Sequence, residues 1–256
     1  MPARIIAIAN QKGGVGKTTT AISLSEVLAE HGKKTLLCDL DPQAHATLGL
    51  GFQKNHVTKS ITQVLLDGVA ASDVILETSF ENLNLIAADS NAIGLEIQLI
   101  DFENRESRLR NPLNSLRDLF EYIILDTPPS LGLITINALS ASDSVLIPIQ
   151  CEFLAMEGLV QLLNTIRHVR ESLNSSLQIE GIVLTMHDAR TKLSREVESE
   201  IRGYFEGRIR VFKSVIPRNI RLSEAPSHGM PITVYAKNTP GSWSYVNLGE
   251  ELMGID

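Results

Sequence analysis

Residues 11–19 read QKGGVGKTT, and they lie between an apolar run, Ile5 to Ala9, and a stretch with helical spacing. This is the setting of a phosphate-binding loop, because its glycines let backbone N–H groups turn towards phosphate oxygens at a helix N-terminus. Lys17 is expected to pair with the β- and γ-phosphates, and Thr18 to bind magnesium. The motif therefore predicts a site for ATP with Mg²⁺. Its expected nucleotide-binding residues are Gln11, Lys12, Gly13, Gly14, Val15, Gly16, Lys17, Thr18 and Thr19, the last near the α-phosphate.

Apolar runs recur along the chain with helical stretches between them. The first such stretch, Thr18 to His31, places Ala21, Leu24 and Leu28 on one stripe, and Gly32 follows as a C-terminal cap. Continuous apolar strands that alternate with helices predict an α/β fold: a doubly wound, mostly parallel sheet with helices on both faces. Ligands of such sheets bind at the carboxyl ends of the strands. The expected strands are Ile5–Ala9, Thr35–Cys38, Leu83–Ala87, Tyr122–Leu125, Val145–Ile149, Ile179–Thr185 and Val211–Ile216.

Carboxylates follow two of these strands. Asp126 comes directly after Tyr122–Leu125 and before two prolines, which predicts an acceptor for a magnesium-bound water. Asp39 and Asp41 follow the second strand, and one of them is expected to position the attacking water, although Asp residues before Pro42 could instead only form a turn. No glutamate follows Asp126, so slow hydrolysis is expected. The predicted metal-site residues are Thr18, Asp39 and Asp126.

Composition sets the broad class. The 256 residues are 43% hydrophobic and 21% charged, which is typical of a globular α/β domain, and we expect residues 1–256 to form a single domain. The segment from Gly51 to Arg110 is polar and weakly periodic, so it is expected to carry peripheral helices. No helix-turn-helix segment precedes the phosphate loop.

Apolar run lengths, cysteines, net charge and histidines narrow the class of protein further. No apolar run approaches the roughly 18 residues of a spanning helix, so a cytoplasmic protein without a membrane partner is expected. Cys38 and Cys151 lie in apolar runs and are expected to be buried and reduced. The net charge of −7 argues against a uniformly basic nucleic-acid binder but leaves a local basic face open. The six histidines show no metal-ligand spacing, so magnesium is the expected metal.

One departure from the standard phosphate loop is informative. Gln11 stands where the pattern has glycine, and a second lysine, Lys12, follows it. The loop thereby resembles that of the ParA/MinD/nitrogenase-iron-protein superfamily. By that resemblance, Lys12 crosses to the nucleotide of the partner subunit in an ATP-sandwiched homodimer. A cation that reaches the γ-phosphate only on association would make dimerisation control hydrolysis.

Further segments resemble the chromosomal ParA (Soj) pattern within this superfamily, namely residues 130–132, 147–152 and 216–219. The resemblance implies that Asp41 is the hydrolytic aspartate, which with Lys12 and Lys17 completes the catalytic set, and that Asp39 supports the magnesium shell. It also implies that ATP dimers bind double-stranded DNA without sequence preference until a ParB-type activator stimulates hydrolysis. The adenine is expected to contact Pro217, Arg218 and Asn219, with Met186 and Asp188 as further candidates.

A basic segment fits the expected DNA contact. Residues 207–221 hold five Arg or Lys residues and no acid, and Arg190 lies in a second cluster nearby. Contacts to phosphates would make binding independent of sequence and sensitive to salt. The alternative, a solvated surface, stays open. The predicted DNA-binding residues are Arg190, Arg218 and Arg221, which would place the protein on the nucleoid.

Three rival functions can be compared with the sequence. A MinD-like positioning ATPase for a protein or membrane cargo would end in a basic amphipathic helix, whereas Gly249–Asp256 has acids and no Lys or Arg. An iron–sulfur protein would need two bridging cysteines, and Cys38 lies within a predicted strand. A scaffold that binds ATP without hydrolysing it is the third. The tail Thr239–Asp256 departs from the family pattern and receives no role.

Overall fold

Strands of continuous apolar residues form one mixed sheet at the centre of the molecule. The computed structural model describes residues 2–152 and 155–255. Within them the sheet has the order β3-β4-β2-β5-β1-β6-β7-β8, and only the β3–β4 pair is antiparallel. The strands are β1 Arg4–Ile8, β2 Thr35–Asp39, β3 Ile75–Glu77, β4 Leu83–Ile86, β5 Tyr122–Asp126, β6 Ser144–Gln150, β7 Gln178–His187 and β8 Val211–Pro217.

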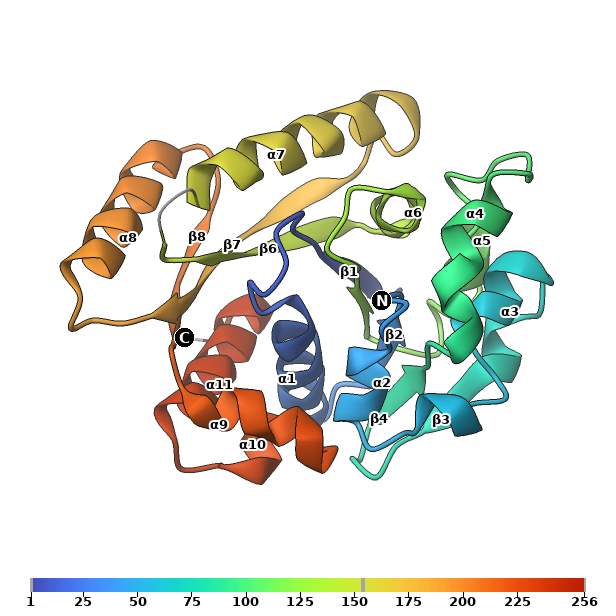
Figure 1. Ribbon diagram of the computed structural model, residues 1–256, viewed down its shortest axis with the longest axis horizontal. Coiled ribbons are helices and arrows are strands. Elements are labelled where there is room, and N and C mark those ends of the chain that lie inside the picture. The colour runs from blue at the N-terminus through green and yellow to red at the C-terminus, as the bar shows by residue number, and fades with distance from the viewer. Residues whose placement is uncertain (1, 153–154, 256) are drawn as a thin grey trace.

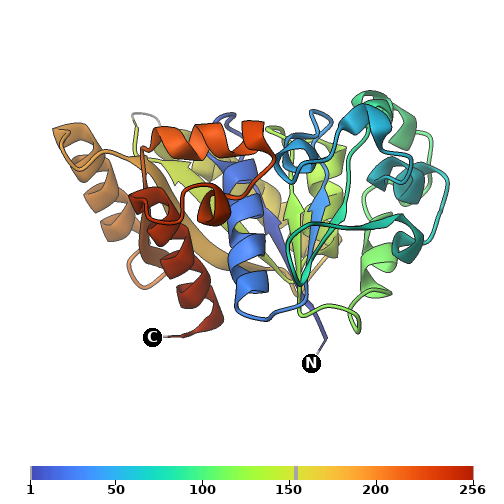
Figure 2. The ribbon, with the colours of Figure 1, turned by 90° about the horizontal axis from the view of Figure 1, so that it is seen from below.

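Helices cover both faces of the sheet (Figure 1). α3 to α8 pack on one face, and α1 and α11 cover the other, where Figure 2 shows α9 and α10 beside α1. Each face buries its own apolar cluster, as a sheet flanked by crossover helices requires. The helices are α1 Lys17–Glu30, α2 His45–Gly49, α3 Ile61–Leu66, α4 Leu95–Leu99, α5 Arg110–Asn114, α6 Leu133–Ala141, α7 Ala155–Ser172, α8 Lys192–Phe205, α9 Ile220–Glu224, α10 Ile232–Tyr235 and α11 Pro240–Met253. Single 3₁₀ turns are η1 Lys54–His56, η2 Ala71–Val74, η3 Ser90–Gly94 and η4 Ala225–His228.

The predicted fold class is confirmed, and so are the seven predicted strands, each to within two residues at either end. The segment 51–110 carries peripheral helices α3 and α4, as expected, but it also contributes β3, which the sequence analysis missed. β3 is only three residues long and none of them is fully buried, so it leaves no apolar run to detect. Both cysteines are buried free thiols. In the described ranges, no helix is long and apolar enough to cross a membrane.

The C-terminal segment, which the sequence left without a role, is an integral part of the fold. Helix α11 packs against α1 and β8, and Tyr245 on it is buried, with its hydroxyl 3.1 Å from the Thr20 hydroxyl on α1. The carboxylate of Glu251 accepts hydrogen bonds from the backbone N–H groups of Lys213 and Ser214 on β8. The tail thus connects the first helix to the last strand.

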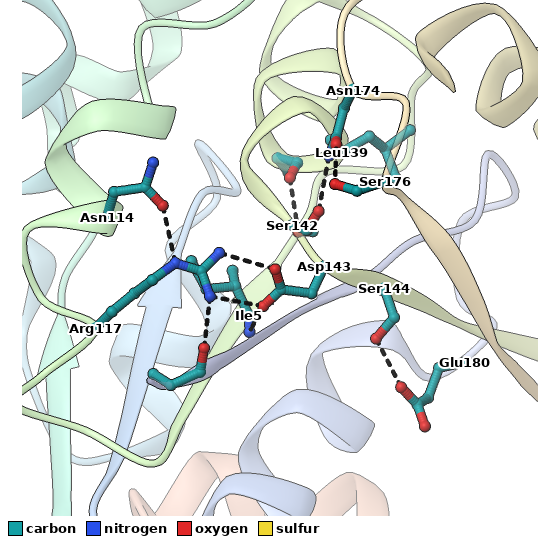
Figure 3. A network of polar contacts seen from close by, with 12 residues as sticks. Ile5, Asn114, Arg117, Leu139, Ser142, Asp143, Ser144, Asn174, Ser176 and Glu180 are labelled. Atoms are coloured by element: carbon teal, nitrogen blue, oxygen red, sulfur yellow. Dashed lines mark hydrogen bonds and ion pairs between the residues drawn. The ribbon is translucent and has the colours of Figure 1, made fainter. Parts of the chain in front are cut away.

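A polar network ties the amino ends of the central strands together (Figure 3). Arg117 donates to both carboxylate oxygens of Asp143, at 2.8 and 2.9 Å, and also to the backbone carbonyl of Ala3. Asp143 in turn accepts a 2.8 Å hydrogen bond from the N–H of Ile5 on β1. Asp143 therefore links β1, the start of β6 and the segment that carries Arg117.

Replacing Asp143 with alanine is expected to lower the free energy of unfolding by about 1–3 kcal/mol, because it leaves the Ile5 N–H without its acceptor and removes the carboxylate partner of the Arg117 guanidinium. Asp143→Asn is the matched control, since the amide oxygen can still accept from Ile5 and should retain part of this stability. Urea denaturation of the three proteins measures the difference. Equal stability of Asp143→Ala and wild type would show that water replaces the network at no cost.

Candidate nucleotide-binding site

The phosphate loop connects β1 to α1 and is held by neighbouring strand ends. Gly14 and Gly16 have φ angles of 72° and 88°, in the left-handed region that favours glycine. The Gln150 amide, at the end of β6, donates to the Gly14 carbonyl at 2.7 Å, and the Thr185 hydroxyl on β7 donates to the Val15 carbonyl at 2.8 Å. With these carbonyls engaged, the N–H groups of the loop are left for an anion.

The two loop lysines lie in opposite environments. Lys17 is buried at the start of α1, and its ammonium donates to the Lys12 carbonyl at 3.0 Å. Burial lowers the pKa of Lys17, while the nearby Asp126 and Asp41 carboxylates raise it. The Lys12 side chain is exposed, and within the described part of the chain its ammonium makes no hydrogen bond or ion pair. Lys17 thus lies beside the carboxylates of this subunit's own site, whereas the Lys12 side chain is exposed to solvent.

Asp126 at the end of β5 is a fully buried carboxylate whose two oxygens have no hydrogen-bond partner among the described residues. Burial raises its pKa well above the ordinary value, and the Asp39 carboxylate adds to the rise. The Thr18 hydroxyl lies near enough to lower this pKa, although its geometry falls short of a hydrogen bond. An unpartnered buried carboxylate beside a hydroxyl and a phosphate loop fits a divalent cation.

Asp39 lies opposite Asp126 in the β2–β5 register but has a different environment. Its Oδ1 accepts from the Asp41 N–H at 3.1 Å, and its Oδ2 accepts from both the N–H and the hydroxyl of Thr47, at 2.7 Å each. Burial raises the pKa of Asp39 to about 6, and the hydrogen bonds from Thr47 oppose this rise. Asp39 is therefore engaged in holding α2, whereas Asp126 is free.

Asp41 lies between Asp39 and α2. It is buried, and its Oδ1 accepts from the Gln43 N–H at 2.9 Å. The structure thus places all three predicted carboxylates at the carboxyl edge of β2 and β5. No group of three or more His, Cys, Asp or Glu side chains in the described residues could hold a metal ion by itself. That is compatible with magnesium, which is commonly bound by one or two carboxylates together with water and substrate phosphates.

A small cavity of about 160 Å³ opens beside the loop and brings together most residues predicted for the base. Its walls include Thr19, Met186, Pro217, Arg218 and Asn219. Met186 has a φ angle of 51°, an uncommon value for a residue with a side chain, and the Gln150 amide contacts its sulfur at 2.9 Å. Tyr245 also lines this cavity, and the sequence analysis missed it because it lies far along the chain in a helix with no motif.

The three predicted DNA-binding arginines are exposed but not free. Arg190 binds both oxygens of Asp188, Arg218 binds Glu152 at 2.8 Å and Arg221 binds Glu224 at 2.8 Å. Asp188 is therefore the ion-pair partner of Arg190 and does not line the base cavity. The pKa of Asp188 is lowered to about 2, mainly by the hydrogen bonds from Arg190 and also by the charge of Arg218. Within the basic segment 207–221, which has no acid in its sequence, Arg210, Arg218 and Arg221 are thus paired with acids from elsewhere in the chain.

A phosphate loop between a strand and a helix, with carboxylates at the neighbouring strand ends, defines a P-loop ATPase. Residues 3–179 match the model of the AAA domain family AAA_31. The chain is 52% identical to the sporulation initiation inhibitor protein Soj of Bacillus subtilis (strain 168), over 97% of this chain and 98% of that protein. It is 49% identical to the chromosome partitioning protein ParA of Myxococcus xanthus (strain DK1622), over 99% of this chain and 89% of that protein.

Among solved structures, the crystal structure of cobyrinic acid a,c-diamide synthase from Mycobacterium smegmatis, with bound ADP and magnesium, is 35% identical with a TM-score of 0.85. The match covers 98% of this chain and 94% of that one. The chain belongs to the ParA/Soj family of chromosome-partitioning ATPases.

Proposed function

We propose that this protein is an ATP-dependent DNA-partitioning switch: ATP promotes a sandwich dimer, the dimer binds double-stranded DNA without sequence preference, and a ParB-type activator releases it by stimulating hydrolysis. The chain is an ATPase, and its cofactors are ATP and Mg²⁺. The observation that carries the proposal is the opposite placement of the two loop lysines, with Lys17 buried towards the carboxylates and Lys12 exposed.

The proposed chemistry follows from that placement. Lys17 and the loop N–H groups hold the phosphates, and Thr18 with Asp126 holds the magnesium, which neutralises phosphate charge when bound. Asp41 orients the attacking water. Asp39 acts indirectly, as a positioning residue, because its two carboxylate oxygens already accept hydrogen bonds from Asp41 and Thr47. Lys12 of the partner subunit would bring a further positive charge to the γ-phosphate, so hydrolysis would wait for association.

The base and the DNA would be bound on adjacent segments. We place the adenine in the cavity beside Met186 and Pro217–Asn219. Arg190, Arg218 and Arg221 lie on the segments that follow β7 and β8, where their exposed guanidinium groups could exchange carboxylate partners for DNA phosphates. Exposed ion pairs contribute little stability, so this exchange costs little. The DNA of the nucleoid would be the surface on which the protein acts.

The test is binding to a long duplex of arbitrary sequence at several salt concentrations, with a non-hydrolysable ATP analogue, with ADP or without nucleotide. We expect binding with the analogue alone, falling steeply with salt. Arg218 also lines the cavity assigned to the adenine, so each variant is tested at an analogue concentration that saturates it. Under that condition Arg218→Ala should weaken DNA binding on every sequence and reduce the salt slope by about 1. Arg105→Ala is the matched control, because Arg105 is also an exposed, ion-paired arginine but lies far from the predicted patch in the sequence.

The outcomes separate the rival functions. Binding that needs the ATP analogue and weakens only in Arg218→Ala supports the partitioning switch. Absence of nucleotide-dependent DNA binding at low salt would leave a positioning ATPase with a protein or membrane cargo. Equal weakening in Arg105→Ala and Arg218→Ala would show that only overall charge matters.

A further inference from the structure

Two glycines bring the segment after Asp41 into direct backbone contact with the segment that carries Arg221. Gly51 follows α2, and Gly229 follows η4. A Cβ atom placed on Gly229 would lie 2.7 Å from the Gly51 Cα and 3.0 Å from its nitrogen. Real side chains do not approach so closely, so this contact requires that Gly229 lacks a side chain, whereas a Cβ atom on Gly51 would meet only the Gly229 carbonyl oxygen, at 3.6 Å. A third glycine, Gly49, would clash with Ile22 of α1 if it carried a Cβ.

On one side of this contact, α2 and the residue before it are bonded to Asp39 and Asp41. Thr47 donates twice to Asp39, and the Ala44 N–H donates to the Asp41 carbonyl at 2.8 Å. Ala44 has a φ angle of 58°, which is strained for an alanine. A change at Asp41 on nucleotide binding would therefore act on a short, strained connection and move α2.

On the other side, side-chain contacts connect residues 219–235 into one unit, which also bonds to Glu26 on α1 through Thr233. Glu224 accepts from both Arg221, at 2.8 Å, and the Tyr235 hydroxyl, at 3.3 Å. The rings of His228 and Tyr235 stack with centroids 4.8 Å apart. The unit begins at Asn219, directly after Arg218, so a shift at Gly229 reaches the arginines through bonded neighbours.

We propose that the Gly51–Gly229 contact transmits the nucleotide state from the Asp41 segment to residues 219–229, and so controls the position of the arginines. This regulation rests on the proposed function for its biological purpose, but the contact acts whether or not DNA binds. Because the two backbones touch without side chains between them, a displacement of α2 cannot be absorbed by a change of rotamer. Gly229 is thus a positioning residue.

The test compares hydrogen–deuterium exchange of residues 219–229 with ADP and with a non-hydrolysable ATP analogue, with the dimer fraction measured in the same samples. The variants are Gly229→Ala, which breaks the contact, and Gly68→Ala as matched control. Gly68 has nearly the same φ angle, 70° against 65° for Gly229, but a Cβ there meets nothing within 4 Å. Both variants place an alanine at a positive φ angle, and only Gly229→Ala disturbs the contact.

We expect wild type and Gly68→Ala to show a nucleotide-dependent difference in exchange, and Gly229→Ala to reduce that difference at least about five-fold, the lower end of typical coupling between sites. Equal exchange of residues 219–229 in the wild-type protein with both nucleotides would refute the inference without any variant. A wild-type difference that persists in Gly229→Ala would refute it as well. DNA binding is measured separately. A transmitted change without DNA binding would uphold this inference and refute the DNA function.

Discussion

Lys17→Ala is expected to lose most of its ATP binding at concentrations that just saturate the wild-type protein. The ammonium is buried and is the positive charge between the phosphate loop and the carboxylates Asp41 and Asp126. Without it, a triphosphate would meet a cluster of buried negative charge. Truncating one partner of a buried charge pair costs about 2–5 kcal/mol, so the dissociation constant should rise about 30-fold or more.

Equilibrium titration with a fluorescent ATP analogue and Mg²⁺ measures this effect. Lys12→Ala is the matched control, because it removes a lysine from the same loop whose side chain is exposed. Its ATP affinity as a monomer should stay within about three-fold of wild type, well under the 1.4 kcal/mol that a ten-fold change represents. ATP binding by Lys17→Ala close to wild type would mean that this loop does not hold the phosphates.

Mixing two inactive variants should restore hydrolysis. Asp41→Ala removes the proposed water-orienting group from a subunit's own site, and Lys12→Ala removes the proposed cation from the partner's site. In a mixed dimer, the site on the Lys12→Ala subunit keeps its own Asp41 and receives Lys12 from its partner. With random pairing at equal amounts, half the dimers are mixed and one of their two sites is complete, so about one quarter of wild-type turnover is expected.

This experiment distinguishes whether Lys12 acts in the site of its own subunit or in the site of the partner subunit. If Lys12 served its own subunit, no site in the mixed dimer would be complete and no activity would return. Stimulated ATPase rates of each variant alone and of the mixture are the measurement, and the same protein concentration is kept throughout. Recovery of activity therefore reports a lysine that acts across the dimer interface, and a mixture that stays inactive contradicts it.

The sequence could predict the features that depend on neighbouring residues. Continuous apolar runs identified seven strands because parallel strands are buried on both faces. The convergence of Asp39, Asp41 and Asp126 could also be predicted, since parallel strands bring their carboxyl ends to one edge of the sheet. The glycines of the loop at residues 13–16 fixed where the first strand ends and the first helix begins.

Features that depend on distant residues could not be predicted. Glu152 lies 66 positions before Arg218, so a count of charges along the sequence could not reveal that they pair. Asp39 and Asp41 look alike in sequence, and only the hydrogen bonds from Thr47 distinguish them. Tyr245 reaches the base cavity because α11 packs on α1 and β8, which no local pattern indicates.

The carboxylate of Glu251 limits how the edge of the sheet can pair with a strand of another chain. β8 is the last strand of the sheet, and an edge strand with open N–H groups is a template on which another chain can add a strand. Glu251 occupies two of these groups from the end of a helix, so no second backbone can bond there. The edge of β8 is thereby blocked at Lys213 and Ser214, in the middle of the strand, which hinders lateral addition of another strand there.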